Sequence, residues 1–198
     1  MYIKLITLIS FLILSFQVSA TSNIVDLYLD LPNDFLQLTH DSNGKAYTKQ
    51  ERLKAIKVKD IKNGYLHLKD PDSISEYTLA IFRLKNGNQL LALVSSGESV
   101  EHFQILQKLK KSWKDVSDTF LPKTPDSFIL SQYQRLFPSD KRFKNGDYIQ
   151  GYAQSVVRYR LPQKGTTIEA RTGIDEVGVY DKTLFHLDFD REKFVIRK

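Results

Sequence analysis

The chain has 198 residues, with 29 Lys and Arg against 23 Asp and Glu, which gives a formal net charge of +6 with histidine neutral. This mild positive charge is spread along the sequence, so it does not require a nucleic-acid partner, and we expect none. Cys is absent and the only Met is Met1, which excludes disulfides, thiol catalysis and thiolate metal sites.

The first 20 residues have the pattern of a secretory signal peptide. Lys4 supplies the positive start, residues 6–16 are almost entirely apolar, and Val18-Ser19-Ala20 places small residues before a cleavage point after Ala20. The apolar run is shorter than the ~20 residues that span a bilayer, and no later segment is long and apolar enough to do so. A chain without disulfides suits a bacterial periplasm or secretion from a bacterium, so we expect an exported protein.

Two helix starts are predicted after the leader. Asn23 is suited to cap a helix over residues 24–38, which Pro32 interrupts, although alternating apolar residues there also allow a strand. Thr48 and Glu51 have the spacing of a capping box, in which each residue satisfies a free amide of the other, so a short helix over 49–58 is expected.

The next segment reads as a four-stranded antiparallel meander over residues 65–109. Leu66 and Leu68 share one face of a strand over 65–69, and a strongly apolar hairpin over 76–96 turns at Asn86-Gly87. Asn-Gly favours a two-residue type I′ turn, because both residues tolerate a positive φ. A fourth strand over 100–109 is followed by Trp113, which we expect to close the end of the core.

A second, similar order of elements follows a proline-marked boundary at residues 121–125. Thr124 is predicted to cap a helix with Pro125 in its first position, and Pro138 should end this helix. Strands are then expected over the following ranges: 148–161, 166–171, 183–189 and 194–196. The sequence therefore predicts an α+β fold of two tandem units, 21–122 and 123–198, each a helix with a roughly four-stranded antiparallel sheet.

Several runs resemble a family of uncharacterised secreted bacterial proteins. They are LPNDF, QERLKAI, NGYLHLKD, EYTLAIFRLKNGNQLLALV, FQILQKLKKSWKDV and LPKTPDSF. The resemblance covers about residues 21–130, and it implies an exported leader, a meander followed by a tryptophan, and a second similar half. The implied fold is similar to the tandem helix-plus-sheet architecture of the β-lactamase-inhibitory proteins. No site residue follows from the resemblance.

No local motif predicts a catalytic residue, a metal site or a cofactor. His186 and Asp188 fall on one face of a strand, but no second histidine lies nearby and a zinc site needs three or four ligands. The polar face of a half-buried strand is therefore the preferred explanation of this pair. A hydrolase with dispersed carboxylates stays open as an alternative, because such acids have no local signature.

The later strands carry the most informative surface residues. Arg158, Arg160 and Arg171 should project from one sheet face, with Tyr152 nearby, and arginine with aromatic side chains is enriched in protein interfaces. The same face could bind an anionic envelope component, or it could simply be solvated by long charged side chains. We therefore expect a non-catalytic exported protein that binds an unidentified protein or an anionic component of the bacterial envelope. An inhibitor or immunity protein is one concrete version of this expectation.

Overall fold

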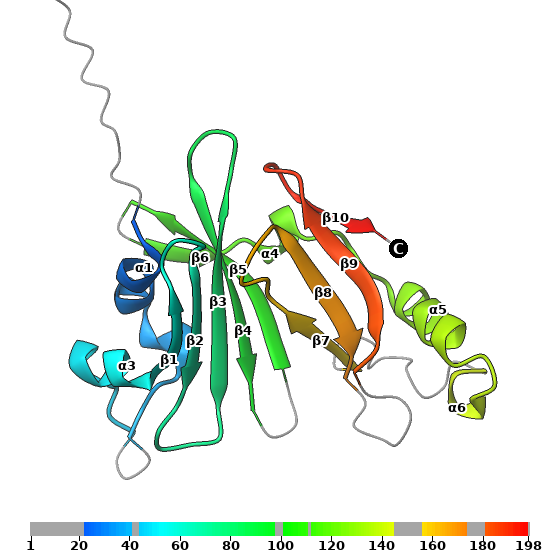
Figure 1. Cartoon of the computed structure of the whole chain (residues 1–198), viewed down its shortest axis with the longest axis horizontal. Helices are drawn as coiled ribbons and strands as arrows, with labels where there is room; N and C mark the ends of the chain where they lie inside the picture. The colour runs from blue at the N-terminus through cyan, green and yellow to red at the C-terminus, as the bar shows by residue number, and fades with distance from the viewer. Residues whose placement is uncertain are drawn as a thin grey trace, which may run out of the picture.

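The computed structural model describes residues 22–40, 44–97, 101–110, 112–144, 156–173 and 181–197. These residues form an α+β fold with two antiparallel sheets (Figure 1), as the sequence predicts. The helices are α1 Ile24–Asp30, α2 Asn33–Leu36, α3 Lys49–Ala55, α4 Ser117–Phe120, α5 Asp126–Leu136 and α6 Lys141–Lys144. The strands are β1 Ile56–Asp60, β2 Tyr65–Lys69, β3 Glu76–Arg83, β4 Gln89–Ser96, β5 Glu101–Leu109, β6 Ser112–Asp115, β7 Val157–Arg160, β8 Thr167–Thr172, β9 Thr183–Phe189 and β10 Phe194–Arg197. The predicted signal peptide lies outside the described residues.

The first sheet is a six-stranded meander in the order β1 to β6, two strands larger than expected. Its four central strands are those predicted. The additional β1 corrects the predicted helix over 49–58, because α3 ends at Ala55 and Ile56–Asp60 pairs with β2 instead. The β-branched residues Ile56 and Val58 favour this extended structure. Lys57 and Lys59, both exposed, lie on the outermost strand, where charged side chains disfavour pairing with another chain.

Local capping signals position the three N-terminal helices. The side chain of Asn23 accepts hydrogen bonds from the backbone amides of Val25 and Asp26, so a helix forms where a strand was also possible. The capping box of Thr48 and Glu51 is present in full, which confirms the predicted start of α3. Pro32 separates α1 from α2, as expected.

The turn between β3 and β4 is a three-residue loop rather than the predicted two-residue type I′ turn. Gly87 has φ +84°, whereas Asn86 is not among the residues with a positive φ. The Gly87 amide donates to the Leu84 carbonyl at 3.0 Å, and the Leu84 amide donates to the Asn88 carbonyl at 2.9 Å. This is the pattern of a turn that ends in a left-handed glycine. Only Gly87 therefore needs the conformational freedom of glycine here.

The second sheet has four antiparallel strands in the order β10-β9-β8-β7. These match the predicted strands, except that the expected first strand over 148–161 is described only from Val157 onward. Helix α5 precedes the sheet, and its N-cap is Pro125 rather than Thr124. On the side of α5 that faces the core, Ile129 and Tyr133 are both fully buried.

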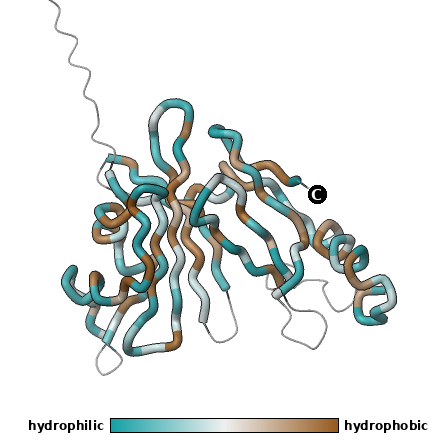
Figure 2. Tube along the Cα trace, in the orientation of Figure 1, coloured by the Kyte–Doolittle hydropathy of each residue, from teal (hydrophilic) through white to brown (hydrophobic). Residues whose placement is uncertain are grey.

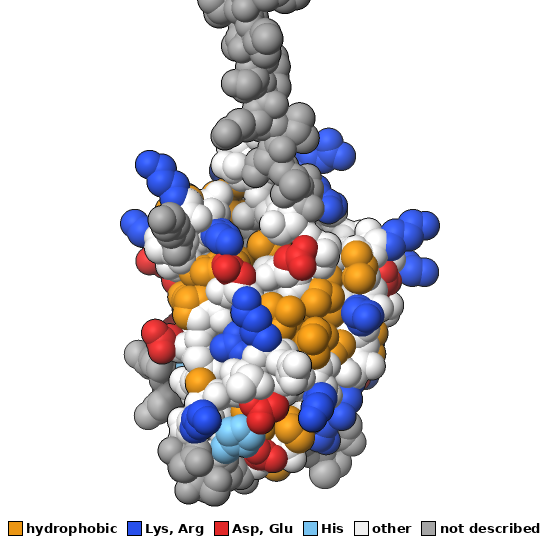
Figure 3. Space-filling model, turned by 90° about the vertical axis from the view of Figure 1, so that its left-hand side faces the viewer, with side chains coloured by type: hydrophobic (Ala, Val, Ile, Leu, Met, Phe, Trp, Pro, Cys, Tyr) orange, Lys and Arg blue, Asp and Glu red, His pale blue; other side chains and the backbone are white. Residues whose placement is uncertain are grey.

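Two hydrophobic cores lie on opposite faces of the first sheet. On one face, α1 and α2 contribute Ile24, Tyr28 and Leu36 to a core that includes Leu79 and Leu93. Trp113 packs against this core, as expected. Figure 3 views the molecule from the side of α1 and α3, where hydrophobic side chains lie together between Lys and Arg side chains.

The second core joins the two sheets. Its buried members come from β3, β4 and β5 of the first sheet and from α5, α6 and all four strands of the second. The Phe82 ring packs edge-on against Phe189 and Phe194, with centroid separations of 5.3 and 4.9 Å. The hydrophilic tips of the β3–β4 and β9–β10 loops also meet (Figure 2), where Lys85 pairs with Glu192 at 2.6 Å. Each sheet therefore forms from a contiguous part of the chain, yet the two share a core.

Candidate binding face on the second sheet

One face of the second sheet is apolar and the other is polar, because its strands alternate. Val157, Ile168 and Ala170 point into the shared core. Their neighbours point outward, and the register places Arg158 opposite Arg171 and Arg160 opposite Glu169. The structure thus confirms that the three predicted arginines share one face, which we call the outer face. Tyr152 lies outside the described residues.

Strands β9 and β10 add further charged residues to the outer face. His186 lies opposite both Glu169 on β8 and Arg197 on β10, and Asp188 lies opposite Thr167. Arg197 was not predicted as a site residue. The sequence does indicate its face, because strand alternation places Arg197 on the same side as Val195 and on the side opposite to Phe194 and Ile196. Its position beside His186 depends on strand register.

Arg171 is held by contacts within the molecule. Its Nη1 lies 2.6 Å from Glu169 Oε2 and its Nε lies 2.8 Å from Asp181 Oδ1, while Nη2 donates to the Asp181 carbonyl at 2.8 Å. Only 17% of the side chain is exposed. Arg171 therefore links β8 to Asp181, two residues before β9, whereas Arg158 and Arg160 are exposed.

Asp188 is also paired within the outer face. Arg197 Nε lies 2.5 Å from its Oδ2, and the Thr167 hydroxyl donates to its Oδ1 at 2.7 Å. These hydrogen bonds, that of Arg197 first, hold the pKa of the Asp188 carboxyl below its ordinary value. An ionised carboxylate that is engaged by an arginine is poorly placed to serve His186 as a metal co-ligand or to act as a general base.

A shallow hollow of about 430 Å³ lies where the outer face meets the start of β2. Its charged and polar lining includes Arg160, Gln163, Lys164, Thr167, Glu169, His186 and Arg197. Three of these side chains are cations and one is a carboxylate. Neither Arg160 nor Lys164 forms an ion pair with another described residue. The hollow therefore presents unneutralised positive charge to a ligand, in groups suited to phosphate or carboxylate oxygens.

A partly buried carboxylate lies behind this face, between the two sheets. Glu101 on β5 accepts a hydrogen bond from the Tyr159 amide on β7, and its other oxygen accepts from the Ser96 hydroxyl at 3.2 Å. Burial raises the pKa of Glu101, and burial together with the nearby Glu101 charge raises the pKa of Tyr159 to about 12. The Tyr159 ring stacks on Phe103 with centroids 4.3 Å apart. A small hollow beside Glu101 has no second carboxylate among its described lining residues, so this position lacks the acid pair of the hydrolase alternative.

The raised pKa of Glu101 predicts a pH-dependent effect of Glu101→Gln. The folded chain holds a proton on Glu101 more readily than the unfolded chain, so ionisation of this group costs stability above the raised pKa. The amide side chain of the variant would keep an oxygen acceptor for the Tyr159 amide but would not ionise. We expect the stability of Glu101→Gln relative to wild type to rise with pH above about 4.5, the ordinary glutamate value.

Urea unfolding of both proteins at several pH values between about 4 and 8 measures this difference. Glu76→Gln, which changes a partly exposed glutamate on β3, is the control and should give a smaller slope. A difference between Glu101→Gln and wild type that does not change with pH would contradict the assignment.

Two further observations concern the described residues as a whole. None of their helices is long and apolar enough to cross a membrane. Within the same ranges, no group of three or more His, Cys, Asp or Glu side chains is arranged to hold a metal ion.

Comparison with known proteins gives a fold but no activity. Neither protein-family models nor curated proteins give a match. Among solved structures, the chain is similar to a domain of an uncharacterised protein from Porphyromonas gingivalis W83, with a TM-score of 0.50 and 13% sequence identity over 88% of this chain and 97% of that one. At this identity the likeness concerns the fold alone. The resemblance to secreted proteins and to the β-lactamase-inhibitory fold remains a prediction.

Proposed function

We propose that this chain is a non-catalytic exported protein whose outer face binds an anionic partner, either a component of the bacterial envelope or an acidic protein surface. The observation that carries the proposal is the hollow in which Arg160 and Lys164 are exposed and form no ion pair with another described residue, whereas Arg197 is paired with Asp188 and Glu169 with Arg171. Cations grouped in this way attract anions and accelerate their association. Export is part of the proposal, and its support is the pattern of residues 1–20.

The geometry favours an extended partner over a small substrate. The hollow opens onto a sheet face on which Arg158 is also exposed, so positive charge continues beyond the hollow itself. Arginine on a rigid strand loses little conformational freedom when it binds, and its planar group can donate two parallel hydrogen bonds to one phosphate or carboxylate. Salt should weaken such binding, because exposed charges are screened.

The test measures retention of lipopolysaccharide and of periplasmic proteins by immobilised residues 21–198. The variant is Arg160→Glu/Lys164→Glu, and the matched control is Lys49→Glu/Lys54→Glu, which changes net charge equally on α3, beyond the first sheet. We expect wild type and control to retain the same anionic partner, and the outer-face variant to retain it at least about tenfold more weakly, equivalent to about 1.4 kcal/mol. The proposal fails if no partner is retained by wild type, or if the two variants behave alike.

A further inference from the structure

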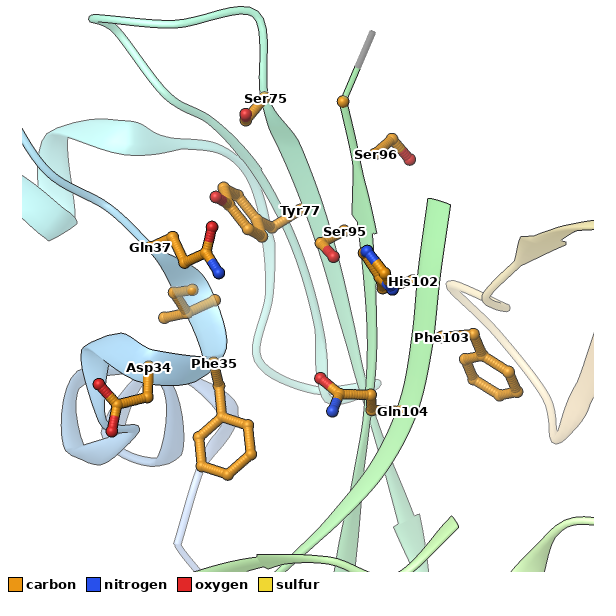
Figure 4. Close-up of a pocket in the computed structure, with 12 residues that line it drawn as sticks. Asp34, Phe35, Gln37, Ser75, Tyr77, Ser95, Ser96, His102, Phe103 and Gln104 are labelled. Carbon is orange, nitrogen blue, oxygen red and sulfur yellow. The ribbon is translucent and has the colours of Figure 1, made fainter. Parts of the chain in front are cut away.

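A larger hollow lies on the opposite side of the first sheet from the second sheet. It has a volume of about 530 Å³, within the range of ligand sites. One wall is α2, with Phe35 and Gln37, and the floor is formed by β3, β4 and β5. Figure 4 shows these side chains on the two sides of the open groove, while Phe103 points away toward the second sheet. This groove shares no lining residue with the hollow on the outer face.

The floor of the groove changes from apolar to polar where the helices no longer cover the sheet. Leu79, Leu93 and Leu106 are buried beneath the helices. On the same face, the register continues to Ser95 and His102, which lie opposite each other on β4 and β5. Strand alternation under a helix layer normally yields apolar residues on the covered face. Beyond the helices this face is uncovered, so the hydroxyl of Ser95 and the imidazole of His102 are accessible at the floor of the groove.

Several polar groups of the groove remain available to a ligand. Gln37, Ser95 and His102 form no side-chain hydrogen bond with another described residue. Gln104 donates through its amide nitrogen to Asp115 at 2.8 Å, an arrangement that fixes its side chain. Tyr77 is 5% exposed, and burial raises the pKa of its hydroxyl, which interacts with Ser75, so Tyr77 forms part of the base of the groove rather than a contact for a ligand.

The charge of the groove is as informative as its shape. The chain is basic, yet no Lys or Arg is among the described residues that line this groove, and Asp34 is their single acid. An anionic ligand would lack a partner here. Strands β3 and β4 of the floor are each paired along both edges, so a peptide cannot join these two strands by backbone hydrogen bonds as an added strand.

We propose that this groove binds a neutral saccharide. Amide, hydroxyl and imidazole groups can each donate and accept hydrogen bonds, which matches the hydroxyls of a sugar ring. The ring of Phe35, which is partly exposed on α2, supplies apolar surface for the C–H face of the sugar. The open groove accommodates a segment of a longer chain as readily as a free end.

The test uses nuclear magnetic resonance of isotope-labelled residues 21–198 with four probes: maltotriose, mannotriose, N,N′-diacetylchitobiose and cellotriose. We expect at least one sugar to shift the backbone amides of Ser95, His102 and Gln104 in a saturable manner. Absence of such shifts with all four sugars overturns the proposal. The outer-face variant Arg160→Glu/Lys164→Glu should bind the sugar as wild type does, so this proposal and the proposed function fail separately.

Two variants remove groove contacts while preserving the fold. Gln37 has φ +47°, so Gln37→Gly deletes the amide and places glycine where it is favoured. His102→Ala removes an exposed imidazole. The control is Gln107→Ala, on the same strand but with its side chain on the opposite face. Each groove variant should weaken binding about tenfold, the effect of one or two lost hydrogen bonds, and the control should not. Equal affinities in all three would overturn the assignment.

Discussion

Phe82→Ala is expected to lower the free energy of unfolding by about 3–5 kcal/mol, the range for removal of a buried phenylalanine ring. Phe82 is 2% exposed and contacts the rings of Phe189 and Phe194, so its loss leaves a cavity between the two sheets. Since the cavity borders both sheets, both should lose stability together. Urea unfolding, followed by Trp113 fluorescence and by circular dichroism, measures the change.

The same experiment tests whether the predicted units 21–122 and 123–198 unfold separately. Trp113 reports on the first sheet, whereas circular dichroism reports on both. With a shared core we expect coincident transitions in wild type and in Phe82→Ala. Two separated transitions, with only one affected by the substitution, would show independent units. Ile74→Ala, at a position that is 57% exposed, is the control and should change stability by less than about 0.5 kcal/mol.

Arg52→Met should have the second large effect, a loss of about 2–4 kcal/mol, because it leaves buried backbone acceptors without a donor. The Arg52 side chain is 7% exposed and donates to the Leu31 carbonyl at 2.6 Å and to Asn33 Oδ1 at 3.2 Å. In return, the Tyr28 hydroxyl donates to the Arg52 carbonyl at 2.8 Å. This single guanidinium therefore joins the end of α1 and the start of α2 to α3.

Amide hydrogen exchange and urea unfolding measure the effect of Arg52→Met. Faster exchange should be concentrated in α1 and α2, since these helices lose the contacts of the guanidinium. Arg83→Met, which changes an exposed arginine at the end of β3, is the matched control. An increase in exchange that is uniform along the chain, or a loss of stability as small as that of Arg83→Met, would contradict the role of Arg52 in joining these helices. Because α2 forms a wall of the groove, the Arg52 variant should also bind the saccharide more weakly.

For the candidate sites, strand alternation predicts which side chains share a face, but it does not predict their contacts. Alternation in β7 and β8 correctly places Arg158, Arg160 and Arg171 on one face, since successive side chains of a strand point to opposite sides. Alternation cannot show that Arg171 forms ion pairs with Glu169 and Asp181, because Asp181 lies ten residues further along the chain, after the end of β8. Arg197 and Lys164 reach the same hollow only through strand register and loop geometry.

The sequence by itself determined the elements with strong local signals. Asn23, Thr48 and Glu51 cap helices through contacts within three residues. The apolar patterns of the strands, such as the alternation in β2 and β8 and the continuous run in β4, depend on neighbours in the same strand. Such interactions are encoded over a few positions, so they can be recognised without the fold. The α+β class follows from them.

Tertiary structure decided three features of this protein, the first with support from the local β propensity of Ile56 and Val58. Ile56–Asp60 forms a strand because it pairs with β2. The two sheets share a core because Phe82 contacts Phe189 and Phe194. The polar groove exists because α2 ends before it covers Ser95 and His102. Each depends on contacts between residues far apart in the chain. Local secondary-structure propensity contributes fractions of a kcal/mol per residue, whereas a buried aromatic contact or a complete strand pairing contributes several kcal/mol. Contacts between distant residues therefore decide the structure where they conflict with local propensity.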